Sequence, residues 1–225
     1  MLAKGFSKLS ISENKICVYA YGVSDSRCTD QKAFLRESAA LKDALISHPD
    51  TIFIYFGSCS VDDPEMIGSP YIDHKLRMES LVSAHVERSL IIRLPQVAGF
   101  TKNKSNLLSF LADHIQHQKS FDLWLNASRN IIDVDDVVAT VKVLIEDTGA
   151  TNKKYNIAST VSHQVAEIVA AMENVLGKKA IFHEKLKGTK SHIDLSRTVK
   201  YLEAARIKFD DDYLLKVISK YYSYY

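Results

Sequence analysis

Residues 52–94 have the sequence IFIYFGSCSVDDPEMIGSPYIDHKLRMESLVSAHVERSLIIRL, and this stretch decides the fold. It begins with an apolar run at 52–56 and ends with another at 90–94. Neither run alternates apolar with polar side chains, which indicates strands buried on both faces, as in a parallel sheet. Between them a helix is predicted over 69–86, since it would begin with a serine N-cap and a proline at the first helical position. The stretch therefore predicts two parallel strands joined by a helix.

The same arrangement precedes this stretch. Residues 16–21 (ICVYAY) form another apolar, β-rich run, and a helix is predicted over 30–48. Three apolar side chains of that helix share one face, namely Phe34, Leu41 and Leu45. The succession of strand, helix, strand, helix and strand predicts right-handed βαβ units in an open α/β sheet.

Beyond Gly99 the pattern is looser and mixes helices with short strands. Helices are predicted over 106–117, 134–146, 162–176 and 213–222, and short strands over 121–125, 155–157 and 181–183. We therefore divide the chain into a first part over 1–99 and a second, mixed part over 100–225.

The composition argues against several classes of function. A formal net charge of +2 gives no electrostatic case for binding nucleic acid or an anionic membrane. Three cysteines without metal-ligand spacing predict free thiols in a reducing compartment, and no metal site is expected. No apolar run approaches the roughly 18 residues of a membrane span, and the first residues lack the apolar core of a signal peptide. We expect a cytoplasmic protein.

A tyrosine and a lysine four residues apart form the candidate chemical group of the helix over 69–86. Tyr71 and Lys75 would share one helix face, and a nearby ammonium lowers the pKa of a phenol, which ordinarily lies at about 10. The pair could then exchange a proton with an alcohol or a carbonyl. Ser58 could hold the substrate oxygen, because ligands of open α/β sheets bind at the carboxyl edge of the strands. Tyr-x-x-x-Lys also occurs by chance, but its place between two buried strands favours the proton-transfer pair.

Four segments of the chain occur, in order, as IYFGSCSV, SPYIDHKLRMESLV, LIIRLPQVAG and RNIIDVDDVVATVKVLIE. Together they resemble an extended short-chain dehydrogenase/reductase of the NAD-dependent epimerase/dehydratase type. The resemblance implies a Rossmann-like, doubly wound parallel sheet, NAD or NADP as cofactor, and a nucleotide sugar as substrate. Residues 1–99 would form the cofactor and catalytic part, and 100–225 a small α/β substrate-binding part with segments that return to the core.

The resemblance also implies roles for individual residues. Ser58 would position the substrate oxygen, Tyr71 would be the acid/base, and Lys75 would lower the pKa of Tyr71 and bind the nicotinamide ribose. Further cofactor contacts would come from Gly22, Pro95 and Val97. Substrate contacts would come from Gln96, Asn106, Leu107 and Arg129, with the arginine meeting the diphosphate.

The chain departs from that family at its start. The family has a glycine-rich, phosphate-binding loop between its first strand and first helix. This chain begins MLAKGFSKL, which resembles the back half of such a loop followed by a helix over 2–9. The first strand would then be missing or reduced, and so would the usual second strand. Either the true start lies upstream of Met1, or the chain is a short form that binds dinucleotide weakly or not at all. The spacing from Ser58 to Tyr71 is short and implies an open pocket.

Several polar residues have more than one interpretation. Asp133, Asp135 and Asp136 are interpreted as a helix cap in preference to metal ligands. His74 is interpreted as a surface residue. Ser60 is a second candidate for the hydroxyl that meets the substrate.

These features predict an NAD(P)-dependent epimerase or keto-reductase that acts on a nucleotide sugar, in surface polysaccharide biosynthesis. Dehydration is less favoured, because Cys59 and Ser60 stand where that branch has an Asp-Glu pair. The alternative is a non-catalytic nucleotide-sugar-binding or assembly protein derived from the family, which the missing glycines favour. A homodimer through the Tyr71 helix and the preceding helix is a further expectation, which light scattering would test.

Overall fold

The main sheet confirms the parallel α/β architecture. The computed structural model describes residues 1–7, 15–101, 106–190 and 192–224. Four parallel strands stand in the order β1 (Ile16–Tyr19), β2 (Ile52–Ser58), β3 (Ser89–Leu94) and β7 (Lys153–Asn156). β2 and β3 come from the stretch at 52–94 and lie next to each other, so the two apolar runs pair as predicted.

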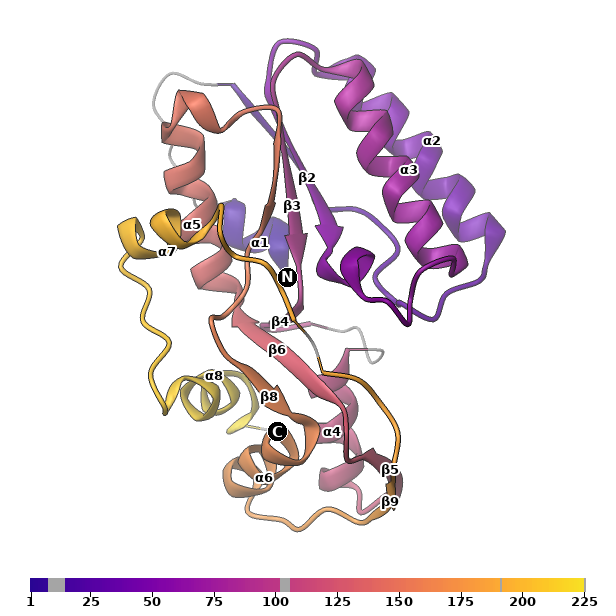
Figure 1. The fold of residues 1–225 in the computed structure, drawn as a ribbon, viewed down its shortest axis with the longest axis vertical. Coiled ribbons are helices and arrows are strands. Elements are labelled where there is room, and N and C mark those ends of the chain that lie inside the picture. The colour runs from indigo at the N-terminus through magenta and orange to yellow at the C-terminus, as the bar shows by residue number, and fades with distance from the viewer. Residues whose placement is uncertain (8–14, 102–105, 191, 225) are drawn as a thin grey trace.

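Helices cover both faces of this sheet (Figure 1). α2 (Gln31–Ser47) and α3 (Pro70–His85) pack against each other on one face. α1 (Leu2–Phe6) and α5 (Val134–Glu146) pack against each other on the opposite face, and α7 (Val199–Ala204) packs on α5.

The two-sided cover explains why the strands do not alternate. Phe53 and Tyr55 belong to the apolar cluster under α2 and α3, whereas Ile52 and Ile54 belong to the cluster under α1 and α5. Every position of β2 from 52 to 55 is therefore buried, and apolar side chains are favoured at all of them.

The helices begin where local sequence predicts. Asp30 caps α2 by accepting the Lys32 N–H at 2.9 Å. Ser69 caps α3 by accepting the Ile72 N–H at 3.4 Å, ahead of a proline at the first helical position. Each cap satisfies a backbone donor that the helix itself cannot pair.

A second group of strands and helices adjoins the carboxyl end of β3. It contains a three-stranded sheet and a parallel two-stranded sheet, flanked by three helices (Figure 1). The strands of the first are β4 (Gln96–Ala98), β6 (Ser128–Asp133) and β8 (Ser162–Gln164), and those of the second are β5 (Phe121–Trp124) and β9 (Phe182–Lys185). The helices are α4 (Leu107–Gln116), α6 (Val165–Leu176) and α8 (Tyr213–Tyr222). α8 lies against α6 and also contacts β4 and β6.

Several short elements differ from the sequence prediction. β4, β6, β8 and α7 were not predicted, and α6 begins after Gln164 and not at Ser162. Ser162 belongs to β8, which pairs with β6 in antiparallel register. A three-residue strand is stabilised by a partner distant in the sequence, so local periodicity does not indicate it.

The carboxyl-terminal aromatic residues dock α8 onto the start of α5. Asp133 accepts the Asp135 N–H at 2.8 Å, which confirms the predicted helix cap. The same carboxylate accepts the Tyr221 hydroxyl at 2.6 Å and the Lys220 ammonium at 2.7 Å. Tyr213 donates to Asp136 at 2.6 Å. The acidic residues of this segment are therefore used to hold α8. In the described residues, no helix is long and apolar enough to span a membrane.

Candidate active site

Ser58 and Tyr71 meet at the carboxyl end of β2. Ser58 is the last residue of β2, and its oxygen accepts the Ser60 N–H at 3.1 Å in the 3₁₀ turn Cys59–Asp62. The Ser58 hydroxyl lies close to the phenol of Tyr71, in the first turn of α3, and acts on it as a hydrogen-bonding group that lowers its pKa. Tyr71 is only 4% exposed and packs in a small apolar cluster with Val61. Ser58, and not Ser60, is thus the hydroxyl that meets the tyrosine.

Lys75 lies one helical turn beyond Tyr71, on the same face of α3. Its ammonium is 5.8 Å from the centroid of the Tyr71 ring. The side chain is 4% exposed, and the ammonium donates to both carboxylate oxygens of Glu37, at 3.0 and 3.4 Å. The structure therefore brings the three predicted catalytic residues together and adds a carboxylate to them.

Glu37 is the residue that the sequence analysis missed. It lies on α2, is 1% exposed, and accepts the Val23 N–H at 2.7 Å and the Tyr55 hydroxyl at 3.1 Å in addition to Lys75. Its position in the helical repeat is the sequence signal that could have identified it. Glu37 falls on the same helical stripe as Phe34 and Leu41, and a glutamate on an apolar stripe indicates a buried, partnered carboxylate.

The interpretation of His74 as a surface residue is wrong. Its side chain is 1% exposed, its ring stacks on Phe34 at a centroid distance of 4.5 Å, and its Nε2 lies 2.9 Å from Glu37 Oε2. α3 packs on α2 through this side, so the residue next to Lys75 faces α2 and not solvent. Because an ionised carboxylate only accepts hydrogen bonds, we assign the Nε2 proton to His74.

The hydrogen bonds at Glu37 hold its carboxyl group ionised. Burial raises the pKa of the group, but the His74 hydrogen bond, the Lys75 charge and the Val23 N–H together lower it to about 2. Burial also lowers the pKa of the Lys75 ammonium, and the facing Glu37 carboxylate works against that shift. The two side chains form a buried pair of opposite charges.

The expectation that Lys75 lowers the pKa of Tyr71 does not hold in this arrangement. Burial raises the pKa of Tyr71 to about 12, the Ser58 hydrogen bond opposes the rise, and the Glu37 charge adds to it. The negative charge of Glu37 balances the positive charge of Lys75, so the lysine does little to lower the pKa of the phenol. Tyr71 is therefore protonated at neutral pH and is placed to donate a proton.

We expect the protein to lose part of its free energy of unfolding at acid pH because of Glu37. The pKa of its carboxyl group is 4.5 in an ordinary environment and about 2 in the fold, so the stabilisation is present above pH 4.5 and is lost as the pH falls toward 2. The shift corresponds to about 3 kcal/mol. In urea titrations between pH 5 and 2, the free energies of unfolding of wild type and Glu37→Gln should converge as the pH falls. Glu146→Gln, an exposed change on α5, should keep the wild-type slope. A constant gap for Glu37→Gln would contradict the assignment.

A second buried carboxylate, Glu79, holds the turn that follows Ser58. It is completely buried and accepts hydrogen bonds from Nε and Nη2 of Arg93 at 2.8 and 2.9 Å. It also forms an ion pair with the Lys154 ammonium at 2.8 Å. Arg93 also donates to Asp62 in the 3₁₀ turn, at 3.1 Å. Asp62 is thus fixed by an ion pair, and the turn that carries the Ser60 N–H is tied to β3.

The predicted cofactor contacts lie in two places. Gly22 follows β1 and lies against the buried pair, because a Cβ built on it would be 2.7 Å from Glu37 Oε1 and 3.2 Å from Lys75 Nζ. Pro95 is the residue between β3 and β4. Val97 is the middle residue of β4 and is buried. Gly22 is therefore next to Lys75, whereas Val97 belongs to the second sheet.

The predicted substrate contacts gather on β4, α4 and β6. Asn106 caps α4 by accepting the Leu108 N–H at 2.9 Å and donates to the Val97 carbonyl at 3.2 Å. Gln96 and Leu107 are half-buried. Arg129 is half-buried on β6 and donates to the Ser128 carbonyl at 2.7 Å. Asn106 joins α4 to β4, so it has a structural role whether or not it meets a ligand.

The residues present match a nicotinamide dinucleotide only in part. A ribose and a carbonyl could meet Lys75, Tyr71 and Ser58, although the lysine hydrogen bonds already go to Glu37. A pyrophosphate needs an open glycine turn. A Cβ built on Gly5 would lie 2.8 Å from a methyl group of Val138, so that glycine faces protein. Lys75, Tyr71 and Ser58 are thus placed as a nicotinamide ribose and a carbonyl would require, whereas Gly5 is not placed to receive a pyrophosphate.

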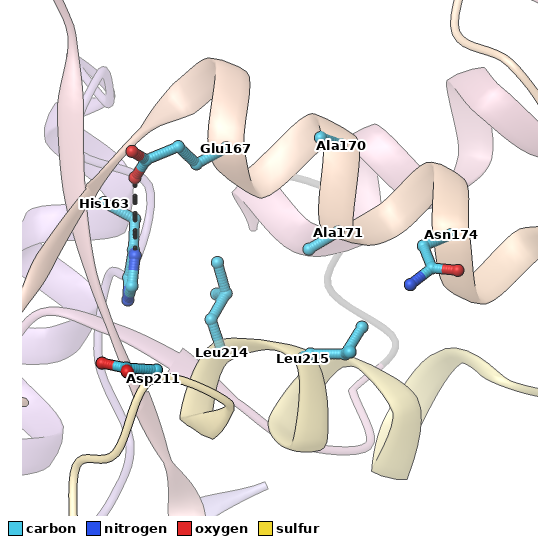
Figure 2. Close-up of a pocket in the computed structure, with 8 residues that line it drawn as sticks. All are labelled: His163, Glu167, Ala170, Ala171, Asn174, Asp211, Leu214 and Leu215. Atoms are coloured by element: carbon cyan, nitrogen blue, oxygen red, sulfur yellow. Dashed lines mark ion pairs between the residues drawn. The ribbon is translucent and has the colours of Figure 1, made fainter.

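An open groove of about 430 Å³ lies elsewhere, between α6 and α8 (Figure 2). Figure 2 shows Leu214 and Leu215 on α8 facing Ala170 and Ala171 on α6. Polar side chains of the groove include His163 and Glu167, whose Nδ1 and Oε2 atoms are 3.5 Å apart. It contains neither Ser58 nor Tyr71, so it is separate from the residues with candidate chemistry.

Comparisons with known proteins agree with the fold. A model of the NAD dependent epimerase/dehydratase family matches residues 35–158. No curated protein sequence matches the chain. Among solved structures, UDP-glucuronic acid 4-epimerase from Bacillus cereus in complex with NAD is 17% identical, with a TM-score of 0.75 over 100% of this chain and 76% of that chain.

Two further solved structures are similar. RMD from Pseudomonas aeruginosa complexed with NADPH is 17% identical, with a TM-score of 0.73 over 93% of this chain and 82% of that chain. UDP-glucose 4-epimerase from Thermus thermophilus in complex with NAD is 13% identical, with a TM-score of 0.71 over 98% of this chain and 80% of that chain. At such identities the likeness establishes a shared fold.

Proposed function

This chain belongs to the NAD-dependent epimerase/dehydratase family, and we propose that it is an epimerase or keto-reductase acting on a nucleotide sugar. The observation that carries the proposal is the placement of the Ser58 hydroxyl beside the Tyr71 phenol at the carboxyl end of β2, with Lys75 one helical turn away. Ligands of open α/β sheets bind at that edge. The dinucleotides bound in the three similar solved structures, two of which are epimerases of UDP-sugars by name, support the substrate and cofactor classes.

The proposed roles follow from the chemistry of each group. Ser58 orients the sugar oxygen, and in reduction of a carbonyl Tyr71 donates its proton to that oxygen as charge develops there. In the oxidative half of an epimerisation the hydroxyl proton passes the other way, to the Tyr71 phenolate. Lys75 holds the ribose of the dinucleotide by charge-assisted hydrogen bonds. NAD or NADP, when bound, supplies or accepts the hydride. Arg129, Gln96, Asn106 and Leu107 bind the nucleotide sugar. The cytoplasmic location, the role in surface polysaccharide synthesis and the homodimer stay predictions from the sequence.

A second candidate is a nucleotide-sugar-binding protein without catalysis. The specific observation in its favour is that both lysine hydrogen bonds go to Glu37, and that Gly5 has no open side for a pyrophosphate. Such a protein would bind the sugar nucleotide and ignore the dinucleotide.

Titration calorimetry separates the two candidates. We expect NADH or NADPH to bind the wild-type chain, and Lys75→Met to weaken that binding by about 10- to 100-fold, because a charged hydrogen-bond donor is lost. UDP-glucose and UDP-glucuronic acid are the sugar probes, and their affinity should change little in Lys75→Met. Binding of a sugar nucleotide without either dinucleotide would favour the second candidate. Equal dinucleotide binding by wild type and Lys75→Met would contradict the assigned role of the lysine.

A further inference from the structure

We propose that Glu37 is a positioning residue of this site, whose carboxylate is the buried counter-charge that fixes the Lys75 ammonium and ties it to the backbone after β1. The inference rests on the proposed function, in which Lys75 serves the reaction. Glu37 itself touches neither the phenol of Tyr71 nor the Ser58 hydroxyl in the described hydrogen bonds. Apart from its charge, which also raises the pKa of Tyr71, its effect on the reaction would pass through the lysine.

The hydrogen bonds leave the Glu37 carboxylate little freedom. Oε1 accepts the Lys75 ammonium at 3.0 Å and the Tyr55 hydroxyl at 3.1 Å. Oε2 accepts His74 Nε2 at 2.9 Å and the Val23 N–H at 2.7 Å, and lies 3.4 Å from the same ammonium. The donors come from α3, from β2 and from the segment after β1, so rotation of the carboxylate would break bonds to three elements.

Burial makes this counter-charge necessary for the lysine. An ammonium in a protein interior loses its proton unless an opposite charge and hydrogen bonds hold it. In the described part of the chain, Glu37 is the one carboxylate within ion-pairing distance of Lys75. Glu79, one turn further on α3, is occupied by Arg93 and Lys154 and does not reach the ammonium. Without Glu37, the pKa of the Lys75 ammonium would fall further.

The surroundings supply few other groups that could replace the carboxylate. Facing groups that titrate or carry charge are Tyr55 on β2, His74 and Glu79 on α3, and Asp25 and Cys28 near Tyr71 in the segment after β1. The tyrosine is a donor to Glu37, and its pKa is raised far above neutral pH by burial and by the carboxylate itself. The tyrosine is therefore not an anion at neutral pH, and in the described residues neither Asp25 nor Glu79 lies within ion-pairing distance of Lys75, so the ammonium depends on Glu37.

Glu37 also joins the lysine to the backbone that follows β1. The Val23 N–H donates to Glu37 and so fixes the position of this segment against α2. Gly22 has no side chain that would collide with Glu37 Oε1. A predicted cofactor contact and the predicted ribose-binding lysine are thus held by one carboxylate. Loss of Glu37 should therefore disturb both together.

The ionisation of Lys75 distinguishes this role from a purely structural one. Lysine side chains labelled with ¹³C at Cε report ammonium deprotonation by NMR, and the Lys75 signal is assigned by its absence in Lys75→Met. At each pH between 6 and 9 the wild-type signal should show a larger ammonium fraction than the signal of Glu37→Gln. In Glu37→Gln its midpoint should fall by at least about one pH unit, as expected for a buried ammonium that has lost a close carboxylate. Glu37→Asp, which keeps the charge, should restore at least part of the ammonium signal at neutral pH.

Asp133→Asn is the matched control. Asp133 is also buried and also accepts a lysine ammonium, a tyrosine hydroxyl and a backbone N–H, but it lies at the start of α5. It should lose a comparable set of bonds and leave the Lys75 titration unchanged. A Lys75 midpoint that moves equally in Asp133→Asn and Glu37→Gln would overturn the proposal.

Other outcomes are equally decisive. An unchanged Lys75 midpoint in Glu37→Gln overturns the proposal, whatever the nucleotide affinity. A shifted midpoint in a chain that binds neither dinucleotide nor sugar nucleotide supports the positioning of the ammonium and counts against the proposed function alone. If Glu37→Gln does not fold, Lys75→Met gives the reciprocal test. Its acid unfolding should move to higher pH, because an unpaired buried carboxylate takes up a proton more readily, and an unmoved transition overturns the proposal.

Discussion

Replacing Tyr71 by phenylalanine should lower the turnover of a nucleotide sugar by about 10²- to 10⁴-fold, the range that a positioned proton donor contributes. Burial raises the pKa of the phenol to about 12, so at neutral pH the group carries the proton that a sugar oxygen would receive. The Ser58 hydroxyl is the neighbour that lowers the pKa of this phenol. The variant removes one oxygen and should cost the fold only about 1 kcal/mol.

The measurement is steady-state turnover of whichever UDP-sugar probe the wild type converts, followed by NMR of the product. Tyr221→Phe is the control, because Tyr221 is also buried and loses a hydrogen bond to Asp133 far along the chain from α3. It should keep wild-type turnover while losing similar stability. Undiminished turnover by Tyr71→Phe would remove the tyrosine from the reaction. Equal losses in both variants would mean that the effect is one of stability.

Much of the fold was predictable because its signals are local. The strands β2 and β3 are apolar at successive positions since both of their faces are covered, and Ser69 and Pro70 start α3 through their own backbone chemistry. The Tyr71–Lys75 face follows from helix periodicity alone. These features need no knowledge of distant contacts.

The electrostatics of the site could not be predicted in the same way. Lys75 was expected to lower the pKa of Tyr71, which assumes that its charge is free. The carboxylate of Glu37, from a different helix, balances that charge, and burial then dominates the phenol. His74 was misplaced for the same reason, since only the packing of α2 on α3 decides which side of α3 is buried. Residues brought together by packing decide the sign of a pKa shift.

The largest loss of stability is expected from Glu79→Gln. Its carboxylate is completely buried and faces two cations that differ in their access to water. The Lys154 side chain is 44% exposed and can turn its ammonium into solvent, whereas the Arg93 side chain is 13% exposed and cannot. Removing one partner of a buried ion pair costs up to about 3–5 kcal/mol, because the remaining charge stays in the interior, and Arg93 would keep only its ion pair with the exposed Asp62. The cost should therefore come mainly from Arg93.

Urea denaturation and thermal unfolding measure this loss, and the melting temperature should fall by about 10 °C for a chain of this size. Asp210→Asn, which breaks an exposed pair with Lys216, should leave both midpoints near wild type. The double variant Glu79→Met with Arg93→Met should recover most of the loss, since neither buried charge remains. If the double variant were as unstable as Glu79→Gln, the loss would come from packing around β3 and not from the guanidinium that has lost Glu79. Because Arg93 also holds Asp62, recovery of stability without recovery of turnover would mean that the ion pair serves the turn after Ser58 as well as the core.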